Sequence, residues 1–242
     1  MLILRALPGG DGLASQSPFV LKTMGWLTVL GLDWQADYKA DIRKQPNGKL
    51  PVLVDGDRVI PDSEAIAEYL QDKAGRRLDD GLGARDQALS QALIRMVEEH
   101  SYFIGVWNRW SEDDNFAPVR AAIEKAAPFP LSRLLPGIIR KGVLKQVRAQ
   151  GIGRMDDDLR LARFTADLDA VEAVLGPGPW LFGDQPRAAD LSVGAILAAI
   201  VVTPKDTEIR RAITSRPALT AYVARARAEL FPAPDAIARV PA

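Results

Sequence analysis

The chain has 242 residues, which suits one large domain or two small ones. Its 31 basic and 31 acidic residues cancel, so we expect no electrostatically driven nucleic-acid partner. The sequence holds no cysteine and one histidine, which excludes disulfides, thiol redox catalysis and metal sites built from cysteines or several histidines. We therefore expect no metal cofactor.

The N-terminal elements alternate between strand and helix. Residues 2–7 form a short apolar run typical of a buried strand. After a glycine-rich loop, Ser17 is a good helix cap and Pro18 a good first helical residue, and Gly31 ends the helix. Residues 34–39 are a candidate second strand. The order strand, helix, strand predicts a right-handed parallel crossover.

A hairpin signal follows. The apolar run after Pro51 is separated by Asp55-Gly56 from a second run at residues 58–60. Asp-Gly between two β-branched runs predicts a hairpin with a type I′ turn, because glycine tolerates the positive φ that this turn requires.

The helix after the hairpin begins at a chemically useful point. Asp62 and Ser63 can cap it, and the free N–H groups of a helix start attract a carboxylate. Asp62 adds an acceptor for an amine, and Ser63 adds a hydroxyl donor. Together they could hold the charged head group of an amino acid at one end of a peptide ligand. The plainer interpretation is an edge-strand proline at Pro51 and an ordinary helix cap.

The sequence KLPVL at 49–53, followed by PDSEAIAEYL at 61–70, resembles the glutathione-binding half of the glutathione S-transferase family. The resemblance implies that Leu50 binds glutathione through its backbone and that Pro51 is cis and flanks the ligand. It also implies that Asp62 and Ser63 bind the γ-glutamyl end.

The resemblance also implies a fold class. We expect an α/β thioredoxin-like, glutathione-binding N-terminal domain at residues 1–75. An all-α glutathione S-transferase C-terminal domain is expected at 86–242, after a linker rich in glycine and charge.

Ser17 is the candidate catalytic residue. The sequence SPFV at 17–20 lies where related proteins carry a Cys-Pro-Phe-Cys type sequence. A hydroxyl at a helix N-terminus could donate a hydrogen bond to the glutathione thiolate, as in serine-type members of the family. A plain N-cap role for Ser17 is the alternative, and Ser15 in the preceding loop is a rival activator.

In this family the first helix of the C-terminal domain lines the cleft for the second substrate. Tyr102, Trp107 and Arg109 lie on the predicted helix at 86–110 and could face that ligand. The competing interpretation is that large aromatic side chains at helical spacing belong to the core.

Later in the chain, Asp190 resembles the last residue of the family's capping box. The usual Ser or Thr cap is replaced by Arg187, which leaves Asp190 to cap its helix alone. This helix contains the longest apolar run, 12 residues at 191–202. A membrane span needs about 20 residues, so we expect a buried helix and no transmembrane segment.

A basic helix is predicted before that one. Residues 131–150 place four apolar side chains on one face, namely Leu135, Ile139, Val143 and Val147. Between Lys125 and Asp156 there are basic residues and no acid: Arg133, Arg140, Lys141, Lys145, Arg148 and Arg154. Attraction to an anion or a membrane surface is one interpretation. A solvated helix face, offset by the acids at 156–158, is the one we prefer from sequence alone.

The sequences SPF at 17–19, RW at 109–110 and QGIGR at 150–154 are similar to the glutathione S-transferase-like branch related to metaxin and failed axon connections.

Two functions stay open. The protein either binds glutathione and conjugates its thiolate to a small apolar electrophile, or it is a non-catalytic binding or interaction protein. We expect a cytoplasmic protein. Family members are often dimers, and zero net charge does not oppose a homodimer.

Overall fold

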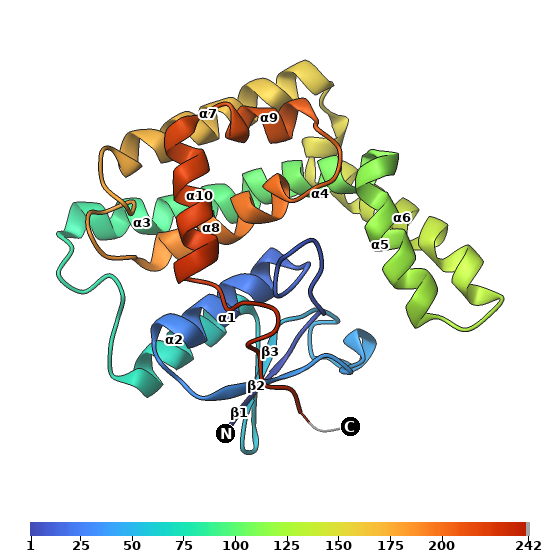
Figure 1. Ribbon diagram of the computed structural model, residues 1–242, viewed down its shortest axis with the longest axis horizontal. Helices are drawn as coiled ribbons and strands as arrows, with labels where there is room; N and C mark the ends of the chain where they lie inside the picture. The colour runs from blue at the N-terminus through green and yellow to red at the C-terminus, as the bar shows by residue number, and fades with distance from the viewer. Residues whose placement is uncertain (241–242) are drawn as a thin grey trace.

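The computed structural model describes residues 1–240. The N-terminal half is a four-stranded sheet with two helices, and the C-terminal half is helical (Figure 1). The strand order is β2-β1-β3-β4, with β1 parallel to β2 and the other pairs antiparallel. The elements of this half are β1 (Leu2–Arg5), α1 (Pro18–Val29), β2 (Trp34–Asp37), a 3-10 turn (Ile42–Lys44), β3 (Val52–Asp55), β4 (Arg58–Pro61) and α2 (Ser63–Ala74). This confirms the thioredoxin-like fold and the parallel crossover.

The β3–β4 hairpin exists, but the predicted turn is wrong by one residue. Asp55 pairs with Arg58, so the loop consists of Gly56 and Asp57. Gly56 has φ +57°, while Asp57 is not among the residues with positive φ. A positive φ at the first loop residue alone fits a type II′ turn rather than type I′. Gly56 supplies the positive φ of the turn. Asp55 stays in the strand, and its carboxylate accepts hydrogen bonds from Tyr69 and Lys73.

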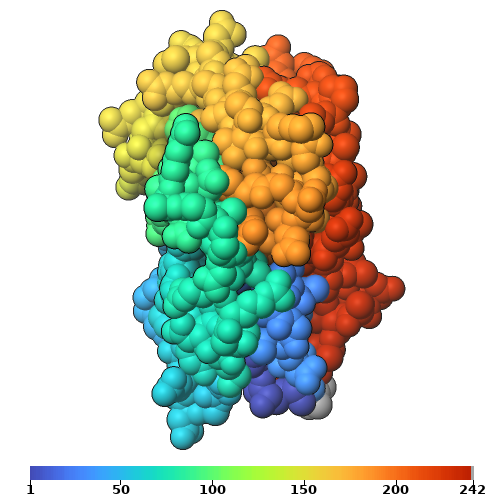
Figure 2. All heavy atoms as spheres, turned by 90° about the vertical axis from the view of Figure 1, so that its left-hand side faces the viewer, coloured from blue at the N-terminus to red at the C-terminus, as the bar shows by residue number. Residues whose placement is uncertain are grey.

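The helical half follows an exposed linker. Its elements are α3 (Ala84–Met96), a π-helical turn (Val97–Ser101), α4 (Tyr102–Ser111), α5 (Asp113–Ala126), α6 (Leu131–Gln150), a 3-10 turn (Ile152–Arg154), α7 (Asp157–Leu175), α8 (Ala188–Val201), α9 (Glu208–Thr214) and α10 (Pro217–Glu229). Figure 2 shows the teal linker and α3 running up one side of the molecule, from the blue N-terminal half to the helices above. Within residues 1–240, no helix combines the length and the apolar character needed to span a membrane.

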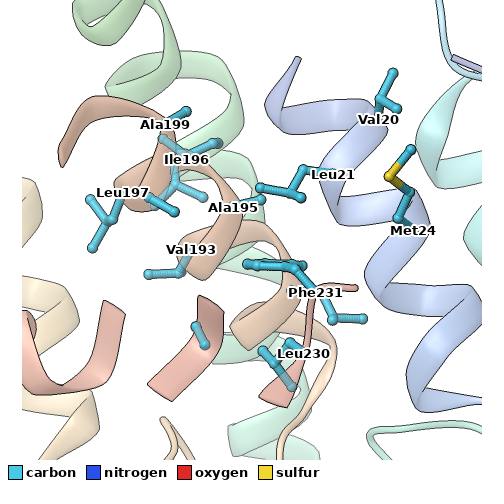
Figure 3. Close-up of a cluster of buried hydrophobic side chains, with 14 of the residues drawn as sticks. Val20, Leu21, Met24, Val193, Ala195, Ile196, Leu197, Ala199, Leu230 and Phe231 are labelled. Carbon is cyan, nitrogen blue, oxygen red and sulfur yellow. The ribbon is translucent and has the colours of Figure 1, made fainter. Parts of the chain in front are cut away.

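Helix α8 is the centre of the structure. Every residue from Ala189 to Ile200 is buried, as expected from its continuous apolar run. It packs against α1, α3 and α10. Figure 3 shows α1 side chains such as Leu21 beside α8 side chains such as Ile196, with Phe231 between the two helices. One continuous core therefore joins the two halves and fixes how α1 sits.

The start of α8 is capped differently from the sequence prediction. Asp190 does accept from the Arg187 N–H, at 2.8 Å. It does not cap alone, because the Asp79 carboxylate of the linker accepts from the Ala188 N–H, also at 2.8 Å. The Arg187 side chain holds this linker in place by donating to the carbonyl oxygens of Leu78 and Asp80. A residue from the linker thus replaces the missing Ser or Thr cap.

The segment after α10 returns to the sheet. The Ala36 N–H donates to the Ala238 oxygen at 2.8 Å, and the Val240 N–H donates to the Ala36 oxygen at 3.1 Å. The Arg239 guanidinium lies 5.5 Å from the centre of the Tyr38 ring. This segment covers the open edge of β2, where unpaired backbone groups would otherwise invite another chain.

Candidate functional site

The strand register brings the predicted pieces of the site to one edge of the sheet. Val52 pairs with Arg5 of β1 on one side and with Pro61 of β4 on the other. The start of β3 therefore lies beside the ends of β1 and β4. The loop leading to α1, the Leu50–Pro51 segment and the start of α2 all leave from this edge.

The peptide bond between Leu50 and Pro51 is cis. Both residues are buried, and they lead directly into β3. Pro51 has no N–H, so the backbone donor nearest to the strand in this segment is that of Leu50. These two residues are the first part of the candidate site.

Asp62 and Ser63 lie at the start of α2, directly after β4. Asp62 has φ +76° and caps α2, with its Oδ1 accepting from the N–H groups of Glu64 at 2.9 Å and Ala65 at 3.2 Å. Among residues 1–240, neither the second carboxylate oxygen of Asp62 nor the hydroxyl of Ser63 has a hydrogen-bond partner, although Ser63 is only 6% exposed. A negative charge and a hydroxyl are thus held at the N-terminus of α2 with hydrogen-bonding capacity to spare.

The two candidate serines at α1 differ in their surroundings. Ser15 is buried, and its hydroxyl donates to the Leu7 oxygen at 2.9 Å and accepts from the Ser17 N–H at 3.2 Å. Ser17 caps α1, and its Oγ accepts from the Val20 N–H at 3.4 Å. In the described part of the chain, the Ser17 hydroxyl proton has no acceptor. Ser15 therefore holds the loop in shape, while Ser17 retains a free donor at the helix start.

Helix α4 places side chains near the start of α1, the end that carries Ser17. The Tyr102 ring meets the Phe19 ring edge-on, with ring centres 4.8 Å apart. Arg109 Nη2 donates to the Ala199 oxygen at 2.6 Å. Burial lowers the pKa of Arg109, against the opposing effect of the Asp11 carboxylate in the loop before α1. Tyr102 thus faces the N-terminal half, and Arg109, seven residues further along, lies on the same side of α4.

Trp107 faces elsewhere on α4. The Arg160 guanidinium lies 4.6 Å from its ring centre and the Arg148 guanidinium lies 5.8 Å from it. The core interpretation therefore fits Trp107. Of the three α4 residues named in the sequence analysis, Tyr102 and Arg109 lie on the side of the candidate site, and Trp107 does not.

The structure adds a charge network that the sequence analysis missed. Lys22 of α1 is 1% exposed, and its Nζ donates to Glu64 Oε1 at 2.7 Å and to Glu98 Oε1 at 2.6 Å. Ser192 of α8 also donates to Glu98 Oε1, at 2.7 Å. Because Glu64 follows Ser63, the network ties the start of α2 to the helical half. A single lysine inside the apolar run of α1 was the available signal.

Two pockets lie elsewhere in the molecule, and neither is lined by the candidate site residues or by the Lys22 network. One of about 360 Å³ lies between α7 and α9 and is lined by Thr165, Glu208 and neighbouring residues. Another of about 350 Å³ lies between Leu13, Ala14 and residues of α10 and Phe231, behind the loop that leads to Ser17. Across the described part of the chain, no cluster of three histidine, aspartate or glutamate side chains is placed to hold a metal ion.

The chain joins a thioredoxin-like domain, with its cis proline and capped helix, to a helical bundle. Solved structures of the same fold class exist. Glutathione transferase GSTFuA3 from Phanerochaete chrysosporium superimposes with a TM-score of 0.65 at 19% identity, over 95% of this chain and 96% of that one. At this identity the likeness shows the fold.

Sequence comparison shows the family. The profile of the glutathione S-transferase N-terminal domain matches residues 18–115, and that of the C-terminal domain matches residues 164–226. Isoprene-epoxide–glutathione S-transferase of Rhodococcus sp. (strain AD45) is 30% identical over 222 residues, covering 89% of this chain and 93% of the relative. The chain belongs to the glutathione S-transferase family.

Two further relatives match the branch that the sequence analysis named. Failed axon connections of Drosophila melanogaster is 28% identical over 238 residues, which cover 93% of this chain and 57% of that longer protein. Metaxin-2 of Homo sapiens is 24% identical over 203 residues, covering 83% of this chain and 77% of the relative. The relatives of this chain therefore include both a transferase and proteins of other names.

Proposed function

We propose that the protein binds glutathione at Leu50, Pro51, Asp62 and Ser63. The observation that carries this is the unused hydrogen-bonding capacity at the start of α2. The second Asp62 oxygen can accept from the ammonium group of the γ-glutamyl end. The Ser63 hydroxyl and the helix N-terminus can bind its carboxylate. The backbone at Leu50 can pair with the ligand backbone.

We further propose that Ser17 stabilises the glutathione thiolate. A free hydroxyl donor at the N-terminus of α1 favours the charged form of the thiol, whose unperturbed pKa is about 8.5. The thiolate attacks an electrophilic carbon, the new C–S bond forms, and the bond from that carbon to the leaving atom breaks. Ser17 keeps its own proton in this scheme and acts through its hydrogen bond.

The second substrate in this proposal is a small apolar electrophile. Phe19 and Tyr102 offer aromatic surface beside α1, and the relative named for isoprene epoxide supports an epoxide as a first substrate to test. When the thiolate opens an epoxide ring, the oxygen gains negative charge and takes up a proton. The half-buried Arg109 lies on the same side of α4 as Tyr102, where its guanidinium would stabilise that charge.

The second candidate function is a non-catalytic binding or interaction protein on the same fold. The similarity to failed axon connections and to metaxin-2 favours it. A cytoplasmic location and a homodimer, both expected from the sequence, remain part of either proposal.

The test is calorimetric titration of glutathione into the parent protein and into Ser63→Ala, with Ser215→Ala as a matched control at an exposed position. We expect Ser63→Ala to weaken binding by at least about tenfold, or about 1.4 kcal/mol, and Ser215→Ala to leave it unchanged. Absence of binding by the parent at millimolar glutathione would refute the glutathione site.

Ser17→Ala separates the two candidate functions. If the protein is a transferase, this variant binds glutathione normally but loses turnover of an epoxide. The pH at which its remaining rate is half-maximal moves upward, because the thiol pKa is no longer lowered. Binding of glutathione by the parent without turnover of any epoxide or halogenated aromatic tested would favour the non-catalytic function.

A further inference from the structure

The α5–α6 hairpin, residues 113–150, stands out from the rest of the molecule. Figure 1 shows it projecting away from both halves, with its turn at the far end. Large apolar side chains at and after this turn are open to solvent. Phe129 is 74% exposed, Leu131 49%, Leu134 60% and Ile138 64%. A solvated basic helix face, as preferred from sequence, does not account for apolar exposure of this extent.

The exposed side chains of α6 form one stripe. Leu131, Leu134, Ile138, Lys141 and Lys145 are all exposed, and they follow each other at spacings of three and four residues. Such residues share one face of an α-helix. The stripe is apolar near the turn and basic further along, and its length from Leu131 to Lys145 is about 21 Å at 1.5 Å per residue.

Several basic side chains of the hairpin have no acidic partner. Within the described residues, no ion pair involves Lys125, Arg133, Lys141 or Lys145. Of the three acids that follow α6, Asp156 caps α7 and Asp157 pairs with Arg160, whereas Asp158 is exposed and pairs with none of these four basic residues.

The nearest acid before the turn is occupied as well. Glu124 of α5 is paired with Arg120 of the same helix, at 2.9 Å. The exposed surface around the turn is therefore apolar and cationic.

We propose that the α5–α6 hairpin docks on the surface of a lipid bilayer that carries anionic headgroups. Phe129 and the apolar half of the stripe enter the boundary between headgroups and acyl chains, about 5–10 Å deep. Arg133, Lys141 and Lys145 meet the anionic headgroups. The glutathione site plays no part in this proposal.

Charge complementarity favours a bilayer over a second copy of the chain. If two copies paired along the stripe in parallel, their lysines would face each other. If they paired antiparallel, as an isologous two-fold contact allows, the lysines of one copy would face the apolar half of the other. Both arrangements bury cations without acidic partners, which is unfavourable. An anionic bilayer instead offers apolar depth and negative charge together.

The experiment is flotation of the full chain with vesicles of phosphatidylcholine alone and with vesicles that also contain phosphatidylserine. One variant combines Phe129→Ser, Leu134→Ser and Ile138→Ser. A second combines Arg133→Gln, Lys141→Gln and Lys145→Gln. Matched controls carry Ile42→Ser, Val59→Ser and Leu159→Ser, or Arg76→Gln, Arg85→Gln and Arg163→Gln, all at exposed positions outside the hairpin.

We expect the parent to float with the phosphatidylserine vesicles and at least about tenfold less with phosphatidylcholine alone. Each hairpin variant should lose at least about tenfold in partitioning, and both controls should keep it. Raising the salt should weaken the binding, because surface charges are screened. Circular dichroism checks that the variants are folded.

A Phe129→Trp variant gives a readout that does not depend on removing side chains. Its added fluorescence should be quenched by a lipid labelled in the acyl chain near the headgroup, whereas that of Leu159→Trp should not. No partitioning of the parent into either vesicle would overturn the proposal. So would equal losses in the hairpin and control variants. A dimer that the apolar hairpin variant dissociates, without any vesicle binding, would also overturn it and assign the stripe to self-association.

Discussion

The buried Lys22 network allows a sharp prediction about how the two halves are held together. Lys22→Met keeps roughly the volume of the side chain but removes its charge. Glu98 would then be left 5% exposed with no cation beside it, keeping the hydrogen bond from Ser192. Glu64 would suffer less, because its side chain is 31% exposed and Arg95 Nη2 still donates to it at 3.0 Å.

The magnitude follows from these surroundings. Removing one partner of a buried ion pair typically costs about 3–5 kcal/mol, because the remaining charge is buried without compensation. We expect Lys22→Met to lie in this range. Glu98→Gln in the same background should recover part of the loss, since it removes the uncompensated charge and keeps an acceptor for Ser192. The coupling between the two positions should be at least about 1 kcal/mol.

The assay is urea unfolding of the parent, both single variants and the double variant, followed by circular dichroism. Comparable m-values would show that the four proteins unfold over a similar surface. Lys22→Gln is a useful companion, because an amide can donate to Glu98 without charge. A Lys22→Met cost below about 1 kcal/mol, or additive effects of the two single variants, would refute the reasoning.

Two further predictions concern α8. Burial raises the pKa of Asp190 to about 6, so the folded state binds a proton more tightly than the unfolded chain between about pH 4 and pH 6. The contribution of Asp190 to the unfolding free energy should therefore fall by about 3 kcal/mol as the pH rises through that window. Urea unfolding of the parent and Asp190→Asn at both ends of the window measures this, and a difference between the two proteins that does not change with pH would contradict it. Gly194→Ala should destabilise the fold by about 1–3 kcal/mol, because its new Cβ would lie 2.9 Å from the Ala226 Cβ of α10. Thermal unfolding measures the loss, with Gly137→Ala, which meets no atom within 4 Å, as the control.

Much of the N-terminal half was readable from the sequence because its signals are local. The cap of α1 at Ser17 and that of α2 at Asp62 depend on side chains that reach backbone groups two or three residues away. The hairpin is marked by a glycine at its turn. The buried character of α8 follows from a continuous apolar run. Together with the resemblance around Pro51, these signals were enough to predict the fold class and the residues of the candidate site.

The tertiary structure decided the features that depend on residues far apart in the chain. Lys22 meets Glu98 across a separation of 76 residues, and Asp79 caps α8 across 109. Neither partner can be identified from local pattern, because an isolated lysine or aspartate is compatible with many environments. The direction in which a side chain leaves α4 is also set by the neighbouring helices, so the sequence could not separate Tyr102 from Trp107.

The α5–α6 hairpin is the plainest example of a feature that depends partly on local sequence and partly on tertiary structure. The sequence by itself determined that residues 131–150 form a basic, amphipathic helix, since periodicity and charge are local properties. Only the tertiary structure decided that Leu134 and Ile138 remain in solvent, because burial depends on whether another element covers that face. In residues 1–240 none does, and the helix projects from the molecule with its apolar stripe uncovered.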